Sequence, residues 1–222
     1  MGLLDNVPQA ENYEEKCLCV FAIDVSGSMD GKPVNELNIG LQQFKLDVAN
    51  DPALCAKLEI GIVTFADRAI ALQNPALLDA FDMPMLKANG CTKTVDGVRL
   101  AMKMVRERKD YWHQTGVAYR RPWIVVITDG EPDSDQDTKA LHQEIEKEKA
   151  SKGFQFLPVG ITDADMKKLA QMSNDVPKKL DGLNFAKFFS WLSSSFSKIS
   201  QSKEGDKIKF AKPDWTEEEY IV

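Results

Sequence analysis

A continuous apolar run that ends abruptly in an acid is the feature that most constrains this chain. Residues 17–23 read Cys-Leu-Cys-Val-Phe-Ala-Ile, and Asp24 follows at once. A run without polar alternation is typical of a strand that is buried on both faces. Three similar runs come later in the chain, at residues 58–65, 123–128 and 154–159. The sequence therefore predicts a sheet whose central strands are shielded from water.

Amphipathic helical patterns separate these runs. Within residues 33–50, apolar side chains recur at steps of three and four, which places them on one helix face. The other predicted helices span residues 95–110, 138–152, 163–172 and 185–199. Thr162 or Asp163 is expected to cap the helix at 163–172. Alternating strands and helices predict an α/β fold: a doubly wound, mostly parallel central sheet with helices on both faces.

One further strand is expected to run against the others. Residues 68–72 follow the second apolar run after only Ala66 and Asp67. Two residues are too few for the crossover that parallel strands need. We therefore expect a hairpin and a single antiparallel edge strand.

Charge and composition exclude several kinds of ligand and location. The 222 residues carry 28 Lys plus Arg against 34 Asp plus Glu, a net charge of −6, whereas proteins that mainly bind nucleic acid normally present a basic face. We find no signal-peptide pattern at the start and no apolar run long enough for a membrane span, so we expect a cytoplasmic protein without nucleic-acid or membrane partners. Cys17 and Cys19 are expected to be buried, reduced thiols.

Two His and four Cys are too few for a usual zinc site, so any metal is expected among oxygen ligands. Asp24-Val-Ser26-Gly-Ser28 places a carboxylate and two hydroxyls at alternate positions after the first strand. Such a loop suits Mg²⁺, which prefers oxygen ligands at about 2.1 Å. The alternative is a plain turn in which Asp24 or Ser26 caps the helix that begins near Pro33.

Two other loops carry matching chemistry. The fragment Asn89-Gly-Cys-Thr92 precedes a predicted helix, and Thr128-Asp129-Gly130 ends a second buried strand. In open α/β sheets, ligands collect beyond the carboxyl ends of the strands, where the strand order reverses. If the strands that end in Asp24 and Asp129 are neighbours there, one cation meets all three loops.

Together these motifs resemble the metal-ion-dependent adhesion site (MIDAS) of von Willebrand factor type A (VWA) domains. The family pattern is D-x-S-x-S, a separate threonine, and T/S-D-G after the fourth strand; it matches Asp24, Ser26, Ser28, Thr92 and Asp129. The resemblance implies that these five residues bind one divalent ion, Mg²⁺ first, with Mn²⁺ or Ca²⁺ as alternatives. It also implies an open coordination position that a partner's carboxylate fills.

The resemblance covers residues 16–200, which leaves residues 1–15 as an N-terminal extension and 201–222 as an acidic C-terminal tail, expected to be solvated or loosely docked. Within the family the chain most resembles bacterial TerY-like proteins of tellurite-resistance and stress-response gene clusters, through residues 63–65, 158–161 and the last helix. A single ion is expected because Met29 and Asp30 replace the consecutive acids of some relatives. Asp133 and Asp135 are expected to cap the following helix.

The resemblance implies a noncatalytic, metal-dependent module that binds an acidic side chain of a protein partner. The enzyme alternative is a haloacid-dehalogenase-like phosphatase or phosphotransferase with Asp24 as nucleophile. Its chemistry needs a second carboxylate two residues later, where this chain has Ser26.

Two further questions stay open at this level. Asp214 or one of Glu217–Glu219 is a candidate to fill the open position in the same or a neighbouring molecule. Residues 106–121 either form an exposed aromatic loop or a helix end whose aromatics pack inward.

Overall fold

The computed structural model describes residues 10, 12–130, 136–203, 206–211 and 213–216. Its centre is a sheet in the order β3-β2-β1-β4-β5-β6. The strands are β1 (Cys17–Asp24), β2 (Leu58–Phe65), β3 (Ala69–Leu77), β4 (Trp123–Thr128), β5 (Gln155–Gly160) and β6 (Lys178–Lys179). All neighbours pair in parallel except β2 and β3, which form an antiparallel hairpin at one edge. The predicted mostly parallel sheet with an antiparallel edge strand is confirmed.

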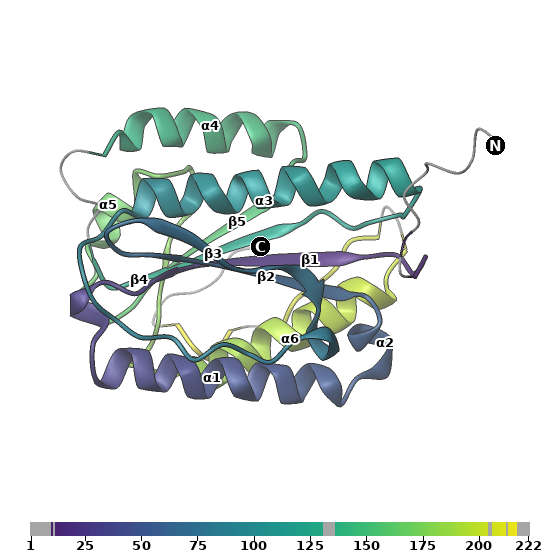
Figure 1. Ribbon diagram of the computed structural model, residues 1–222, viewed down its shortest axis with the longest axis horizontal. Coiled ribbons are helices and arrows are strands. Elements are labelled where there is room, and N and C mark those ends of the chain that lie inside the picture. The colour runs from purple at the N-terminus through teal and green to yellow at the C-terminus, as the bar shows by residue number, and fades with distance from the viewer. Residues whose placement is uncertain (1–9, 11, 131–135, 204–205, 212, 217–222) are drawn as a thin grey trace, which may run out of the picture.

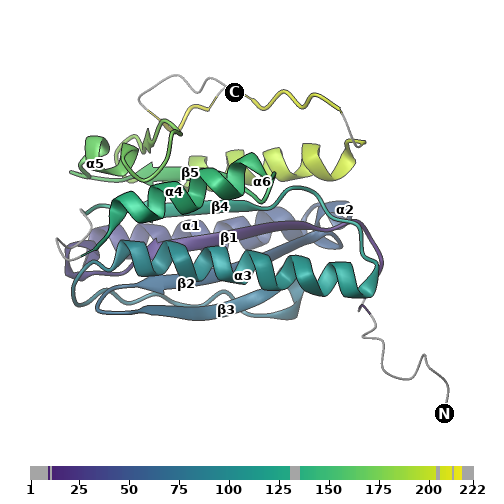
Figure 2. The ribbon, with the colours of Figure 1, turned by 90° about the horizontal axis from the view of Figure 1, so that it is seen from above.

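Helices cover both faces of the sheet (Figures 1 and 2). The helices are α1 (Lys32–Ala49), α2 (Pro52–Cys55), α3 (Thr94–Thr115), α4 (Thr138–Ala150), α5 (Met166–Ala170) and α6 (Phe185–Gln201). Helices α1 and α6 pack on one face, and α3 and α4 on the other. None of the helices in the described part of the chain is both long and apolar enough to cross a membrane.

Strand β1 contributes alternate side chains to the two faces, because side-chain direction reverses at each strand residue. Phe21 and Ile23 point into the core beneath α1 and α6, whereas Val20 and Ala22 point toward α3. This two-sided burial explains why the run from Cys17 to Ile23 contains no polar residue. Cys17 and Cys19 are buried free thiols, as predicted.

Two local predictions need correction, and the structure contains one additional short strand. The helix expected at 163–172 is only α5, and its cap is Asp165, whose carboxylate accepts from Lys167 N and Lys168 N. Strand β6 was not predicted, since two residues between turns carry no periodic pattern. Asp133 and Asp135 lie outside the described residues, and Asp137 is the residue that caps α4.

Residues 106–121 do not form an exposed loop. Helix α3 continues to Thr115 and ends at Gly116, which has a left-handed φ of 72°. Trp112 is fully buried and stacks on Tyr119, with ring centroids 5.0 Å apart. The alternative, a helix end with its aromatics packed inward, is the correct one.

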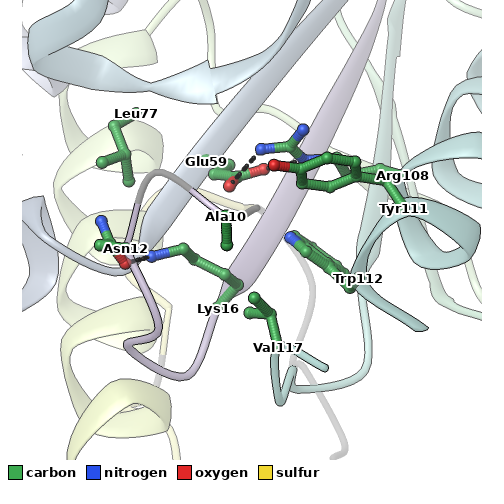
Figure 3. A pocket seen from close by; sticks show the side chains of 9 residues that line it. All are labelled: Ala10, Asn12, Lys16, Glu59, Leu77, Arg108, Tyr111, Trp112 and Val117. Atoms are coloured by element: carbon green, nitrogen blue, oxygen red, sulfur yellow. Dashed lines mark hydrogen bonds and ion pairs between the residues drawn. The ribbon is translucent and has the colours of Figure 1, made fainter. Parts of the chain in front are cut away.

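The amino end of the sheet is closed by a buried ion pair (Figure 3). Glu59 on β2 is 1% exposed and accepts from Arg108 Nε at 2.6 Å and from Nη2 at 2.7 Å. The Arg108 guanidinium also lies 4.5 Å from the ring centroid of Tyr111. A bidentate pair of this kind fixes α3 on the sheet because its two parallel hydrogen bonds constrain both groups.

The prediction of a solvated or loosely docked C-terminal tail is wrong for Trp215, which is 0% exposed. Its ring lies 4.8 Å from that of Phe188 and 5.5 Å from that of Trp191, both on α6. Trp191 Nε1 donates to Ala211 O at 2.9 Å, and residues 206–211 return alongside α6 (Figure 2). Trp215 is therefore part of the domain core, and the partly buried Ile208 and Phe210 pack against the same core.

Candidate metal centre

Asp24 is the carboxylate at the end of β1, and the fold buries it completely. Oδ1 accepts from Ser26 N at 2.8 Å, and Oδ2 accepts from Thr128 Oγ1 at 2.5 Å. Among the residues that the structure describes, no lysine or arginine forms an ion pair with Asp24. A buried carboxylate normally has a cationic partner or a metal, so this site retains an unbalanced negative charge.

The second loop meets the first because β1 and β4 are neighbours. Ile23 pairs with Ile127, which brings the ends of both strands to the same edge of the sheet. Asp129 then lies beside the turn after β1, where its Oδ1 accepts from Ser28 Oγ at 2.7 Å. The predicted meeting of the Asp24 and Asp129 loops at the carboxyl edge is what the structure shows.

Ser26 and Ser28 present their hydroxyls on the same side of a short turn. Their Oγ atoms are 3.1 Å apart, and a single 3-10 turn, Gly27–Met29, holds them there. Ser26 is buried, whereas Ser28 is exposed. The site thus opens to solvent on the side of Ser28.

The loop that carries Thr92 is tied to the turn after β1 by its backbone. Gly27 N donates to Gly90 O at 2.9 Å, and Asn89 N donates to Val25 O at 2.8 Å. A methyl group on Gly130 would lie 3.7 Å from Thr92 Oγ1 and 3.8 Å from Asp24 Oδ2. Thr92 therefore faces the same small space as Asp24, which completes the meeting of the three loops.

Burial raises the pKa of Asp24 from 3.8 to about 6. The hydrogen bonds from Ser26 and Thr128 act in the opposite direction, and the nearby charge of Asp129 adds to the increase. The increase means that the ionised carboxylate is poorly compensated within the protein. A cation bound beside Asp24 and Asp129 would supply that compensation.

The donor set fits a hard divalent cation. Asp24 and Asp129 supply carboxylate oxygens, and Ser26, Ser28 and Thr92 supply neutral hydroxyls, a combination that suits Mg²⁺ better than a thiolate- or imidazole-binding metal. In the described residues, no three His, Cys, Asp or Glu side chains gather in a way that could hold a metal ion. Among the described residues, a cation held by Asp24 and Asp129 would therefore also need the hydroxyls as ligands.

Thr128 is a residue of the site that is not among the five predicted ligands. Its hydroxyl donates to Asp24, and it also accepts from Gly130 N at 3.1 Å. It links the two acidic loops directly. The sequence signal was present, because Thr128 is the first residue of the Thr-Asp-Gly motif.

The remaining acidic candidates are an exposed turn residue, a residue beside α6, and residues outside the described part of the chain. Asp30 is an exposed turn residue whose backbone N–H donates to Gly27 O. Asp214 Oδ2 lies 3.6 Å from Lys187 Nζ on α6. Glu217–Glu219 are outside the described residues, so their predicted role at the open position stays a prediction.

The fold and the site together define a class of protein: a doubly wound domain with an oxygen-lined site at the carboxyl edge of its sheet. The model of the von Willebrand factor type A domain family matches residues 19–188. The chain belongs to this family. No curated protein matches the sequence.

Several solved structures share the fold at low sequence identity. The pilus adhesin SpaC of Lactobacillus rhamnosus GG is 15% identical with a TM-score of 0.65, over 86% of this chain and 31% of that one. Proximal thread matrix protein 1 from the mussel byssus is 18% identical with a TM-score of 0.55, over 82% and 46%. The ArnB paralog VWA2 of Sulfolobus acidocaldarius is 18% identical with a TM-score of 0.53, over 82% and 45%. The chain spans less than half the length of each.

Proposed function

We propose that this chain is a noncatalytic protein-binding module that holds one divalent cation and uses it to capture a carboxylate of a protein partner. The ligands are Asp24, Ser26, Ser28, Thr92 and Asp129. Mg²⁺ is the proposed ion, with Mn²⁺ or Ca²⁺ as alternatives.

The burial of Asp24 without a cationic partner among the described residues is the observation that carries this proposal. Burial keeps the pKa of this carboxyl near 6, yet the hydrogen bonds from Ser26 and Thr128 are built to hold the ionised form. Leaving a charge in that position costs free energy unless a cation balances it. The arrangement is thus explained if the site exists to bind a cation.

Capture of an external carboxylate follows from the charge of the donor set. Two carboxylates formally neutralise a divalent ion, but the other three ligands are neutral hydroxyls. A further anionic ligand is attracted when the ion has an open position, as long as salt screens the repulsion between two acidic proteins beyond about 8 Å. The exposed Ser28 lies on the side from which such a ligand approaches.

The metal preference is an open part of the proposal. The structure of the mussel thread protein is also known with zinc in its MIDAS motif, at 19% identity to this chain. The all-oxygen donor set favours Mg²⁺ in this protein, because zinc sites more often use His or Cys. Zn²⁺ is therefore the ion to compare with Mg²⁺ in a metal titration.

The enzyme alternative receives no support from the geometry. Two residues after Asp24 the turn presents a hydroxyl, Ser26 Oγ, which lies 3.1 Å from Ser28 Oγ. Residue 26 is a serine, so the second carboxylate of the haloacid-dehalogenase scheme is missing. We therefore propose binding without catalysis.

On the sequence resemblance alone, we extend the proposal to a cytoplasmic role in a bacterial tellurite-resistance or stress-response assembly. The resemblance to TerY-like proteins rests on residues 63–65, 158–161 and the last helix.

Self-association through acids of the C-terminal tail is a separate proposal. If these acids fill the open position of the site, deletion of residues 217–222 should increase the affinity for an outside acidic ligand. This deletion leaves Trp215 in place.

Calorimetric titration tests the cation site. Wild type should bind one Mg²⁺ per chain, and Asp24→Asn should abolish binding. Asp30→Ala removes an exposed carboxylate of the same loop and should bind as wild type does. A wild-type protein that binds Zn²⁺ but not Mg²⁺ contradicts the proposed ion, and one that binds no divalent cation contradicts the site.

A displayed library of random peptides tests carboxylate capture. Peptides selected on the Mg²⁺-loaded protein should contain Asp or Glu, should lose binding when that residue becomes Asn or Gln, and should be released by EDTA. Selected peptides that bind equally well to Asp24→Asn contradict capture through the cation.

A further inference from the structure

We infer that Asp67 is a positioning residue for the cation site: its carboxylate holds in place the loop that carries Thr92. The inference rests on the proposed function, since it concerns the same site. Asp67 lies in the turn between β2 and β3, outside all three motifs that predicted the ligands.

The contact is made one residue before the proposed ligand. Asp67 Oδ1 accepts from Cys91 N at 2.7 Å, and Cys91 directly precedes Thr92. Hydrogen bonding with Cys91 lowers the pKa of Asp67 below its usual value. The exposed Asp67 is therefore ionised at neutral pH, and an ionised acceptor makes a stronger hydrogen bond than a neutral one.

Gly90 shows how closely the loop lies against this carboxylate. A Cβ atom on Gly90 would be 2.7 Å from the carboxyl carbon of Asp67 and from both of its oxygens, and Gly90 has a φ of +93°. The positive φ favours glycine, and a Cβ here would push the Asp67 carboxylate away from its present position. The backbone of the loop is thus shaped around the Asp67 side chain.

Backbone hydrogen bonds hold the same loop from two sides. Lys93 N donates to Ala66 O at 3.0 Å on the side of the β2–β3 turn, and Gly27 N donates to Gly90 O at 2.9 Å on the side of the site. Asp67 adds the side-chain contact between them, at the residue beside Thr92. Without it, Thr92 is attached to a glycine-containing loop with fewer constraints.

Mg²⁺ makes this constraint important because it demands nearly ideal octahedral geometry. A hydroxyl ligand on a loosened loop must be ordered when the ion binds, which weakens binding. Groups that orient metal ligands typically change metal affinity by about 10–100-fold when they are removed. We expect an effect of this size from the loss of the Asp67 hydrogen bond.

The charge of Asp67 offers a competing explanation, because any nearby carboxylate attracts a cation. Asp67→Asn separates the two effects, since the amide oxygen can still accept from Cys91 N while the charge is gone. Asp30→Ala is the matched control for loss of an exposed carboxylate near the site.

The first experiment is a calorimetric Mg²⁺ titration of wild type, Asp67→Ala, Asp67→Asn and Asp30→Ala. Asp67→Ala should bind about 10–100-fold more weakly, Asp67→Asn should recover most of that loss, and Asp30→Ala should match wild type. The inference is overturned if Asp67→Ala binds as tightly as wild type, or if Asp67→Asn is as weak as Asp67→Ala.

The second experiment needs no metal and separates this inference from the proposed function. In metal-free protein, the amide proton of Cys91 should exchange faster with solvent in Asp67→Ala than in wild type, as measured by NMR, and Asp67→Asn should restore slow exchange. Failure of wild type to bind Mg²⁺ would overturn the proposed function; unchanged exchange in Asp67→Ala would overturn the positioning role by itself.

Discussion

Asp24 and Glu59 are carboxylates on adjacent parallel strands of the central sheet, and both are almost completely buried. Glu59, near the amino end of β2, forms a bidentate ion pair with Arg108. Asp24, at the carboxyl end of β1, has hydrogen bonds from Ser26 and Thr128 but no cationic partner within the described residues. Arg108 balances the charge of Glu59, whereas no cationic side chain of the described residues balances the charge of Asp24.

The position of each carboxylate along its strand accounts for the difference. The amino end of β2 lies beneath the second half of α3, so a long side chain such as Arg108 can reach it (Figure 3). The turns at the carboxyl end of β1 carry the short oxygen-bearing side chains of Ser26, Ser28 and Thr92. Such turns present small oxygen ligands and leave room for an ion.

The largest expected effect is on stability at the Glu59 end. Arg108→Met removes the ion-pair partner of the buried Glu59, and breaking a buried pair in this way typically costs about 3–5 kcal/mol of unfolding free energy. Urea denaturation should show this loss equally with Mg²⁺ and with EDTA.

The matched control is Arg106→Met, on the same helix. The Arg106 pair with Glu148 is partly exposed, so its loss should cost less than about 1 kcal/mol. If Arg108→Met lowers the unfolding free energy as little as Arg106→Met does, the charge of Glu59 does not depend on Arg108 for its balance.

The next effect is the pH dependence of the metal-free protein. Because the pKa of Asp24 is about 6 in the folded state against 3.8 ordinarily, the folded state binds more protons than the unfolded state between those values. The unfolding free energy should therefore fall as pH rises through that range, by roughly 3 kcal/mol in total, and stay low above it. Saturating Mg²⁺ should restore stability at pH 7.5 more than at pH 5.

Thermal and urea unfolding in EDTA at several pH values measure this effect. Asp24→Asn should lose this part of the pH dependence together with the Mg²⁺ response. A pH dependence that persists unchanged in Asp24→Asn would show that another group causes it.

The smallest effect is expected when both partners of the balanced pair are replaced together. Glu59→Leu with Arg108→Met removes both charges and keeps apolar volume, and such replacements of buried pairs are often neutral or stabilising. The double variant should thus lie within about 1 kcal/mol of wild type, far from Arg108→Met alone. A double variant as unstable as the single one would mean that packing of Arg108, and not charge balance, sets the cost.

Much of the site was predictable because several of its proposed ligands lie close together in the amino-acid sequence. Asp24, Ser26 and Ser28 occupy one turn, so their spacing alone places three oxygens together. Asp129 was expected to lie beside this turn if the two buried strands were neighbours. The structure pairs β1 with β4, so this condition holds. Asp67 could not be found in this way, since its role depends on how two distant loops pack.

The amino-acid sequence by itself determined which segments are strands or helices, which of their faces are apolar, and which turns carry oxygen ligands. Periodicity and turn chemistry encode these local properties. Tertiary structure decided that Trp215 returns to the core on α6, that Trp112 packs inward, and that Arg108 meets Glu59 while Asp24 meets no cation of the described chain. These outcomes depend on contacts between residues far apart in the chain, and no local pattern specifies them.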